Sequence, residues 1–473
     1  MSNATNDIAV IGMGVMGANL ARNFASRGLS VGIYNRTVSL AKEVVKSHPE
    51  AKLDQADTLE ALVAGLKKPR RIIAMVSAGK AVDAVMDSLD ALLEEGDIIV
   101  DAGNSHFEDT ERRCKRADAR PWRFMGMGVS GGAEGALLGP SIMPGGDKEA
   151  WNALRPMLES AAAVSDSGAC VAYCGTGSAG HFVKMVHNGI EYGDMQLIAE
   201  SAVLMRQGLG MPSRAVANTY AEWNRGDLES FLIEITADIF RTPDPKNDSG
   251  LLVDAILDKA GQKGTGRWTV LAAVELGVAI PTIAAAVDAR ALSAQKALRI
   301  QAEEQFAPRR STLAGIRTED LRDALYAAKI ASYTQGFAML RTASDERGYG
   351  SDFGEISRIW KEGCIIRAGF LDRVREAFAA DPELSLLALA PSFQKELKTT
   401  LPALRRVVSA AVTAGLAVPG LSASLSYFDT LVCAQGSANV IQAQRDYFGS
   451  HTYERLDEPG VAVHTDWPSS KDA

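Results

Sequence analysis

Short apolar runs alternate with amphipathic stretches along the first third of the chain. Each run ends in turn residues and is followed by apolar positions at helical spacing, which is the pattern of a strand followed by a helix. Strands that are separated by helices pair in parallel, because each helix crosses over the sheet between them. The pattern therefore predicts an α/β fold with a Rossmann-like doubly wound sheet, whose strands cover residues 7–11, 31–34, 71–76, 97–101, 122–127 and, less regularly, 171–174.

From about Ala179 the pattern changes to long segments of helical period, without convincing alternating runs before the tail. We therefore expect an all-α domain after the sheet. Two echoes within it predict a duplicated helical half: the segment 273–281 recurs at 411–419, offset by 138 residues, and Trp223-x-x-Gly226 recurs as Trp360-x-x-Gly363, offset by 137. Chance similarity in an alanine-rich sequence is the alternative.

The chain of 473 residues is long enough for two or three domains. The change of pattern places a Rossmann-like domain at residues 1–178 and the all-α domain at 179–440. The remaining residues, 441–473, are polar and aromatic and contain two prolines, so this tail looks too irregular to fold alone. Such a tail is usually disordered or docks onto a partner subunit.

Charge and cysteine usage narrow the class of protein. The net charge of -8 and the isoelectric point near 5.5 argue against a broad surface for nucleic acid or anionic membranes, so an anionic ligand must be held by local groups. The first residues lack the basic segment of a signal peptide, and charged residues and Pro281 interrupt the apolar stretch 270–292, so we expect no membrane segment. The five cysteines are scattered and have no zinc-ligand spacing, which favours reduced thiols and a cytoplasmic protein.

A glycine-rich motif stands where the first strand becomes a helix. Gly12, Gly14 and Gly17 form the pattern G-x-G-x-x-G directly after the apolar run 8–11. The first glycine permits a tight turn, the second lets the backbone approach a pyrophosphate, and the third lets helix and strand pack closely. In this position the motif predicts dinucleotide binding by Gly12, Met13, Gly14, Val15, Met16 and Gly17.

The end of the second strand indicates which dinucleotide is bound. An acidic residue there would bind the ribose 2'-hydroxyl group of NAD, but the sequence has Asn35, Arg36 and Thr37. The planar guanidinium of Arg36 can pair with a 2'-phosphate, assisted by Asn35 and Thr37, which predicts NADP as the cofactor. An exposed arginine at a strand end, without a ligand, is the alternative.

Four polar side chains fall on one face of the helix that opens the all-α domain. Lys184, His187, Asn188 and Glu191 stand at positions i, i+3, i+4 and i+7. Taken alone, such a stripe is more often the solvated side of a surface helix. A lysine, a histidine, an amide and a carboxylate within two turns can, however, supply a base, an acid and ligands for hydroxyl groups.

The segment 180–196, G-H-F-V-K-M-V-H-N-G-I-E-Y-G-D-M-Q, resembles the hallmark segment of 6-phosphogluconate dehydrogenases. Further matching segments run through nearly the whole chain, at 35–37, 101–104, 128–132, 263–266, 289–290, 363–367 and 444–453. The resemblance implies a Rossmann-like domain, a duplicated all-α domain for substrate binding and dimerisation, and a tail that reaches the partner subunit of a homodimer. It also implies the oxidative decarboxylation of 6-phospho-D-gluconate to D-ribulose 5-phosphate and CO2 in the pentose phosphate pathway, with reduction of NADP and without a metal.

The same resemblance implies roles for individual residues. Lys184 would take the proton of the C3 hydroxyl group while a hydride leaves C3, and Glu191 would protonate C1 of the enediol. The cofactor would also contact Val76, Ser77, Ala78 and Asn104. The carboxylate and hydroxyl end of the substrate would bind Asn104, Ser130, Gly131, Gly132, His187 and Asn188. Its phosphate would bind Tyr192, Lys263, Thr265 and Arg290, together with Arg445 and His451 of the partner subunit.

The chain departs from the family pattern at a few positions. Many members have lysine where this chain has Ser77, and glutamate is usual at Ala133. Two leucines at 137–138 replace a more polar pair. These positions border the cofactor and substrate loops and bear on the contacts of residues 76–78, whereas the implied acid and base are both retained.

Two other functions stay open at this point. A β-hydroxyacid dehydrogenase that acts on a smaller, unphosphorylated acid would share the N-terminal domain and an active-site lysine. Such an enzyme would need neither the duplicated helical half nor the cationic cluster of residues 263, 290, 445 and 451. A catalytically silent protein that binds NADP or a phosphosugar is the other alternative, and the presence of Lys184 and Glu191 argues against it.

Overall fold

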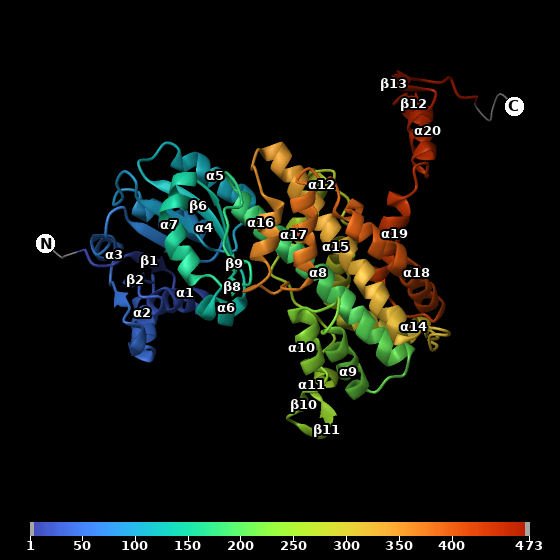
Figure 1. Ribbon diagram of the computed structural model, residues 1–473, viewed down its shortest axis with the longest axis horizontal. Helices are drawn as coiled ribbons and strands as arrows, with labels where there is room; N and C mark the ends of the chain where they lie inside the picture. The colour runs from blue at the N-terminus through green and yellow to red at the C-terminus, as the bar shows by residue number, and fades with distance from the viewer. Residues whose placement is uncertain (1–3, 469–473) are drawn as a thin grey trace. The chain divides into compact units, whose positions relative to one another are not determined.

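The computed structural model describes residues 4–468, with the exception of the side chains of residues 248 and 249. Residues 1–3 and 469–473, at the outer ends of the predicted first domain and of the tail, lie outside the described residues. The chain forms two compact units, Met1–Ser424 and Leu425–Ala473. Figure 1 follows its course from blue at the N-terminus to red at the C-terminus.

A seven-stranded sheet forms the first part of the larger unit (Figure 1). Its strands are β1 (Ile8–Ile11), β2 (Val31–Tyr34), β3 (Asp54–Gln55), β4 (Arg71–Ala74), β5 (Ile98–Asp101), β6 (Arg123–Val129) and β7 (Ile142–Gly146). They lie in the order β3-β2-β1-β4-β5-β6-β7, and every pair is parallel except β6 with β7. This is the order of a doubly wound dinucleotide-binding sheet with one added antiparallel strand, so the predicted fold class is confirmed.

One predicted strand is wrong, and the prediction misses β3 and β7. The run 171–174 is not a strand, because only Val171 pairs, through a single bridge to Ile142. In place of this run, β7 forms the edge of the sheet, although its residues 144–146 are Pro-Gly-Gly and do not have the pattern of a strand. An edge strand tolerates proline, because one side of its backbone has no ladder bond to make. A short hairpin, β8 (Val164–Ser165) with β9 (Gly168–Ala169), is also absent from the prediction.

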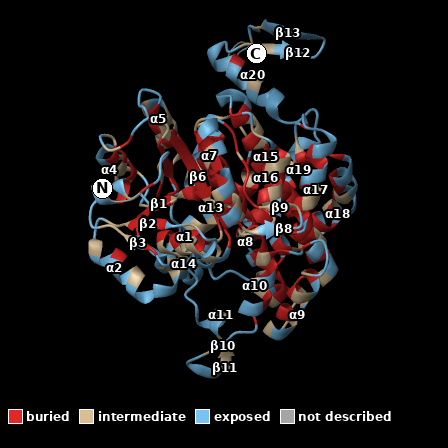
Figure 2. Ribbon diagram, turned by 60° about the vertical axis from the view of Figure 1, so that its left-hand side comes forward, coloured by how far each residue is buried: buried red, intermediate tan, exposed pale blue. Residues whose placement is uncertain are grey.

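Successive residues of each strand point to opposite faces of the sheet and belong to two separate cores. In β1, Ile8 and Val10 belong to one core, whereas Ala9 and Ile11 belong to the other. Figure 2 shows buried residues in the strands and exposed residues on the outer sides of the helices. The helices of this part are α1 (Val15–Ser26), α2 (Val38–Ser47), α3 (Leu59–Ala64), α4 (Lys80–Leu89), α5 (Phe107–Ala117), α6 (Gly132–Leu138) and α7 (Lys148–Ala161).

Helices dominate the rest of the larger unit, and two of them are long. α8 (Ala179–Val203) has 25 residues, α15 (Thr318–Arg347) has 30, and the two pack against each other. The other helices are α9 (Ser213–Trp223), α10 (Phe231–Ile239), α11 (Leu252–Ala255), α12 (Thr265–Glu275), α13 (Pro281–Ser293), α14 (Lys296–Phe306), α16 (Phe353–Ile359), α17 (Phe370–Ala380) and α18 (Pro391–Thr413). A further helix, α19 (Pro419–Leu431), begins in the larger unit and ends in the smaller one. Within residues 4–468, no helix is long and apolar enough to cross a membrane.

The helical elements repeat in one order, as the sequence echoes predict. α8, α9, α10, α12 and α13 are followed by α15, α16, α17, α18 and α19, whereas the short α11 and the connecting α14 stand outside this repeat. In both copies a glycine with positive φ follows a helix, 63° at Gly277 and 72° at Gly415, and a proline begins the next helix. The prediction of helices alone is wrong at one place, where β10 (Pro243–Asp244) and β11 (Asn247–Leu251) form a small hairpin.

The smaller unit is more regular than its sequence indicates. It contains the helix α20 (Ala438–Gly449) and a hairpin of β12 (Tyr453–Arg455) with β13 (Glu458–Val463). The buried carboxylate of Asp446 joins them, since it accepts hydrogen bonds from Thr452 N at 2.9 Å, Thr465 N at 3.1 Å and Trp467 Nε1 at 2.8 Å. These bonds order a segment that lacks a hydrophobic pattern of its own.

Candidate active site

The glycine-rich loop joins β1 to α1 at the carboxyl edge of the sheet, where doubly wound folds bind dinucleotides. Gly12 has a φ of 102°, and a Cβ atom there would lie 2.3 Å from the carbonyl oxygen of Met75. A Cβ atom on Gly17 would lie 1.9 Å from the carbonyl oxygen of Gly12. Gly14, in contrast, has no atom within 4 Å of its missing Cβ, and no side chain caps α1 there. The outer glycines thus pack the loop, and the middle one leaves the helix N-terminus open to a pyrophosphate.

Asn35 holds the glycine-rich loop against the end of β2. Its Oδ1 accepts a hydrogen bond from the backbone N of Met13 at 2.9 Å, and its Nδ2 donates to the carbonyl oxygen of Thr37 at 2.9 Å. Arg36 is exposed beside it, and its guanidinium makes no hydrogen bond or ion pair with another described residue. A guanidinium in this position is available to a ligand bound at the loop.

A buried arginine, which the sequence pattern does not single out, fixes the loops after β4 and β5. Arg113 donates from Nη1 to Asp101 at 3.1 Å, from Nε to Asp83 at 2.8 Å and from Nη2 to the carbonyl oxygen of Gly79 at 2.9 Å. Asp101 also accepts from Ser105 Oγ at 2.7 Å. Because Arg113 stands among other basic residues of α5, nothing in the sequence distinguishes it. The two loops carry the expected cofactor residues Val76, Ser77, Ala78 and Asn104.

Glycines let α8 lie directly on the sheet. A Cβ atom on Gly128 of β6 would come within 2.4 Å of Lys184 Cβ. One on Gly180 would come within 2.5 Å of the carbonyl oxygen of Gly126, and one on Gly145 of β7 would lie 2.3 Å from Gly180 N. This close approach places Lys184 beside the end of β6 and next to the turn that follows it.

The turn between β6 and α6 has two glycines with positive φ, 106° at Gly131 and 64° at Gly132. A Cβ atom on Gly131 would lie 2.6 Å from the carbonyl oxygen of Gly363. Ser130, which precedes them, is buried, and its Oγ lies 3.3 Å from His187 Nε2. The turn is therefore held both by α8 and by the segment that contains Gly363.

Three of the expected site residues are joined by polar contacts along α8. Lys184 Nζ lies 3.4 Å from His187 Nδ1, which lies 3.1 Å from Asn188 Oδ1. A carboxylate oxygen of Glu191 lies 3.9 Å from the same Nδ1. The buried His187 ring meets Trp360 edge to face, with centroids 5.5 Å apart. Lys184 and His187 are buried, and Asn188 and Glu191 are half-buried, so the polar stripe is not the solvated side of a surface helix.

Burial sets the protonation of this cluster. It lowers the pKa of Lys184, against the opposing charge of Glu191. It also lowers the pKa of His187, assisted by Lys184, and raises the pKa of Glu191, against the charges of Lys184 and Arg290. All three shifts favour the uncharged forms: a free amine, a neutral imidazole and a protonated carboxyl group. The cluster can therefore supply both a base and an acid.

Tyr192 and Arg290 come together at the next turn of α8. The guanidinium carbon of Arg290 lies 3.8 Å from the centroid of the Tyr192 ring. A Cβ atom on Gly266 would lie 2.5 Å from the same ring, so the start of α12, with the buried Thr265, packs there as well. Lys263 precedes α12 and is exposed. The expected phosphate ligands of the larger unit thus approach α8 from α12 and α13.

Arg445 and His451 lie in the smaller unit, and both are exposed. Arg445 donates to Gln442 Oε1 at 3.0 Å, and the His451 ring meets Phe448 edge to face at 5.9 Å. Their role in the site of a second subunit stays a prediction.

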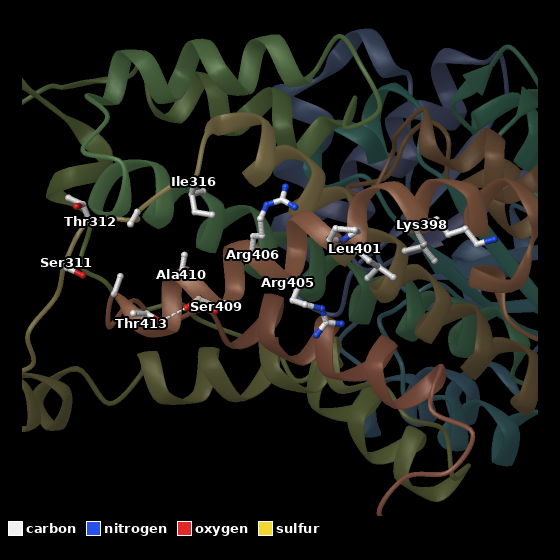
Figure 3. Close-up of a pocket in the computed structure, with 15 residues that line it drawn as sticks. Ser311, Thr312, Ile316, Lys398, Leu401, Arg405, Arg406, Ser409, Ala410 and Thr413 are labelled. Atoms are coloured by element: carbon white, nitrogen blue, oxygen red, sulfur yellow. Dashed lines mark hydrogen bonds between the residues drawn. The ribbon is translucent and has the colours of Figure 1, made fainter.

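A cavity of about 1000 Å³ has none of the expected site residues in its lining. It lies between the segment 311–316 and α18, and Figure 3 shows Lys398, Arg405 and Arg406 among its side chains. Arg406 donates a hydrogen bond to Asp320, so part of the positive charge that lines the cavity is compensated. Among residues 4–468, no three His, Cys, Asp or Glu side chains are grouped so as to hold a metal ion.

Two family models match the chain. Residues 7–175 match the NAD binding domain of 6-phosphogluconate dehydrogenase, and residues 180–467 match the 6-phosphogluconate dehydrogenase C-terminal domain. The decarboxylating 6-phosphogluconate dehydrogenase of Synechococcus elongatus is 51% identical, with 98% of this chain and 100% of the relative covered. That of Escherichia coli K12 is 48% identical, with 97% and 98% covered.

A solved structure shows the same fold over nearly the whole chain. The 6-phosphogluconate dehydrogenase of Plasmodium falciparum, described without ligand, with NADP+ and with 6-phosphogluconate, is 44% identical to this chain. The two structures superpose with a TM-score of 0.94, covering 98% of this chain and 100% of the other.

Proposed function

The chain belongs to the 6-phosphogluconate dehydrogenase family, and we propose that it converts 6-phospho-D-gluconate to D-ribulose 5-phosphate and CO2 while NADP is reduced to NADPH. The reaction is a step of the pentose phosphate pathway. The observation that carries the proposal is the buried cluster on α8, where Lys184 favours its neutral form and Glu191 its protonated form. An oxidation followed by loss of CO2 needs such a base and such an acid.

NADP would lie along the carboxyl edge of the sheet. The open N-terminus of α1 at Gly14 fits a pyrophosphate, and the exposed guanidinium of Arg36 fits a 2'-phosphate. The remaining contacts would come from Val76, Ser77, Ala78 and Asn104. When bound, NADP accepts the hydrogen and the two electrons that leave C3 of the substrate, and the chain's own residues move the protons.

Lys184 takes the proton of the C3 hydroxyl group. Only the free amine can do so, and burial, which lowers the pKa of Lys184, favours that form. His187, 3.4 Å away, is itself held uncharged by burial, so it adds no further positive charge beside the base. Ser130 and Asn188, which contact His187, would bind the carboxylate and hydroxyl groups of the substrate.

Loss of CO2 and protonation complete the reaction. The oxidised substrate is a 3-keto acid, and the electron pair of the broken carbon–carbon bond delocalises into the ketone. Lys184, now protonated, stabilises the enolate oxygen. Glu191 then donates a proton to C1 of the enediol, as its raised pKa permits.

The phosphate end of the substrate would be bound by Tyr192, Lys263, Thr265 and Arg290, with Arg445 and His451 of the partner subunit. The proposal therefore includes a homodimer, in which residues 1–178 bind NADP, residues 179–440 bind substrate and form the dimer, and residues 441–473 reach the other subunit. α20 exposes two aromatic side chains, Tyr447 and Phe448, which supports a partner subunit that covers them. The five cysteines are free thiols, which supports a cytoplasmic location.

The proposal is tested with the purified protein by absorbance at the NADPH band. We expect reduction of NADP with 6-phospho-D-gluconate, a clearly lower rate with NAD, and no turnover of a small β-hydroxy acid without a phosphate. Turnover of the small acid in preference to 6-phospho-D-gluconate would contradict the proposal and favour a β-hydroxyacid dehydrogenase. A folded protein that reduces NADP with neither acid would contradict it as well.

A further inference from the structure

Asp194 continues the polar face of α8 one turn beyond Glu191. Residues three apart on a helix are surface neighbours, with Cβ atoms about 5–6 Å apart. Asp194 is only 3% exposed, so solvent does little to screen its charge from Glu191. Burial is the main reason that the pKa of Glu191 is raised, and the charge of Asp194 acts in the same direction.

Lys329 of α15 holds Asp194 from the facing helix. Its Nζ donates to Asp194 Oδ2 at 2.8 Å, and the lysine is 5% exposed. Its other close neighbours are aromatic, since Nζ lies 5.0 Å from the Tyr333 ring centroid and 5.8 Å from that of Phe370. The two charged groups therefore form an internal pair that joins α8 to α15.

This pair is incompletely satisfied. Asp194 Oδ1 has no hydrogen-bond partner among the described residues. The Tyr333 hydroxyl donates to the carbonyl oxygen of Ile366 at 3.3 Å. Burial raises the pKa of Asp194, but the charge and the hydrogen bond of Lys329 act against this shift and favour the carboxylate form. A buried ion pair with an unpaired oxygen is an inefficient way to stabilise a fold, which points to a functional reason for the pair.

We propose that the Asp194–Lys329 pair positions Glu191 and keeps it protonated. The pair fixes the turn of α8 that carries Glu191 against α15. The carboxylate of Asp194 also keeps a negative charge beside Glu191, so that Glu191 retains its proton until C1 of the enediol accepts it. The inference rests on the proposed function, since it concerns the acid of that reaction. The charged or titratable groups that face Glu191 are Lys184, His187 and Asp194 from α8 and Arg290 from α13. Without Asp194, the positive charges of Arg290 and of Lys184, which is protonated at this step, would act on Glu191 without an opposing negative charge and lower its pKa.

The test is the pH profile of kcat for the full-length wild type, for Asp194→Asn and for Asp194→Asn/Lys329→Met. Because Glu191 must be protonated, the rate falls as the pH rises through its pKa, and a lower pKa moves this alkaline limb to lower pH. In Asp194→Asn the alkaline limb moves to lower pH by about one to two units, because the negative charge beside Glu191 is lost and the positive charge of Lys329 is no longer paired with a carboxylate. In the double variant the limb lies between the other two, because the unpaired positive charge is also removed.

The acid limb, on which Lys184 loses its proton, is the internal control. Lys184 and Asp194 are ten residues apart on α8, or about 15 Å of helix rise, so this limb stays in place. A loss of kcat that is equal at every pH would mean a merely structural role and would overturn the proposal, as would an alkaline limb that does not move.

Circular dichroism checks that each variant folds. If Asp194→Asn does not fold, the double variant, which buries no unpaired charge, must still show an alkaline limb below that of the wild type. A wild type without turnover would overturn the proposed function itself, and the inference with it. Normal wild-type turnover with unmoved limbs would overturn the inference alone.

Discussion

Lys184 is 8% exposed, and in the described part of the chain no carboxylate lies within ion-pair distance of its Nζ. A buried ammonium group without such a partner is costly, so the free amine is favoured and the side chain is suited to act as a base. The sequence predicts which residue types share this face of α8. It does not show that the face is internal, because that depends on glycines of β6 and β7 that are distant in the chain.

Replacement of the base tests its role directly. Lys184→Ala should lower kcat by about 10³-fold or more, within the range for loss of a general base, while NADP binding is retained. The measurement is the initial rate of NADPH formation, with NADP binding followed by fluorescence. Lys398→Ala, an exposed lysine in the cavity of Figure 3, is the matched control and should keep the wild-type rate. A Lys184→Ala protein that forms NADPH at nearly the wild-type rate would show that the base is another group.

We expect Arg36 to set the preference for NADP over NAD. Arg36→Ala removes the charged hydrogen bonds to a 2'-phosphate, which are worth about 1.5–3 kcal/mol, so KM for NADP should rise by about 10- to 100-fold. KM for NAD, which has no 2'-phosphate, should change little. Steady-state kinetics with both cofactors measures the ratio. An unchanged preference for NADP in the variant would contradict the role given to Arg36.

At the scale of elements, central strands and long helices follow from the sequence, whereas edge strands and hairpins do not. β1 is predicted well, because both of its faces are buried and its residues are continuously apolar. β7 and the hairpin β10–β11 contain proline or glycine, and they are fixed by pairing with a neighbouring strand. In α20 and the hairpin that follows it, order depends on the carboxylate of Asp446 and not on a hydrophobic pattern.

The contact between α8 and α19 predicts a pH-dependent stability. Glu200 accepts hydrogen bonds from the backbone N of Gly420 at 2.7 Å and of Leu421 at 2.9 Å, and burial raises its pKa to about 7. A raised pKa in the folded state means that the contribution to stability is present below the ordinary pKa of a glutamate and is lost as the pH rises through about 7.

Glu200→Gln removes this titration. Relative to the variant, the wild type should lose roughly 2–3 kcal/mol of unfolding free energy between pH 4.5 and pH 8, as about 1.4 kcal/mol per pKa unit requires. Denaturant unfolding of both proteins at several pH values gives this difference. A difference that is independent of pH would contradict the raised pKa.

At the scale of the whole molecule, the sequence echoes reveal the duplication, but only one copy carries the proposed chemistry. Lys184, His187 and Glu191 lie on α8 of the first copy, and the residue that corresponds to Arg290 in the second copy is the buried Phe428. The match to 6-phosphogluconate dehydrogenases over 98% of this chain and 100% of the relative argues against a shorter dehydrogenase of similar N-terminal fold. The exposed Tyr447 and Phe448 of the smaller unit support the proposed contact with a partner subunit.

Removal of the tail from Ile441 should weaken substrate binding and the dimer together. The truncated protein loses Arg445 and His451, two ligands expected for the phosphate, so KM for 6-phospho-D-gluconate should rise by about 10²-fold or more. Analytical ultracentrifugation should show a weaker dimer, and KM for NADP serves as the control that should hold. An unchanged KM for 6-phospho-D-gluconate would mean that the tail does not bind the phosphate.

The central claim is that one buried site both oxidises and decarboxylates its substrate, and the most direct test is the ratio of CO2 to NADPH. The purified wild type is given 6-phospho-D-gluconate and NADP, CO2 is trapped, and NADPH is read from its absorbance in the same sample. Equal amounts of CO2 and NADPH at every time point are the predicted result. NADPH formed without CO2 would contradict the claim, because the site would then oxidise the substrate without decarboxylating it.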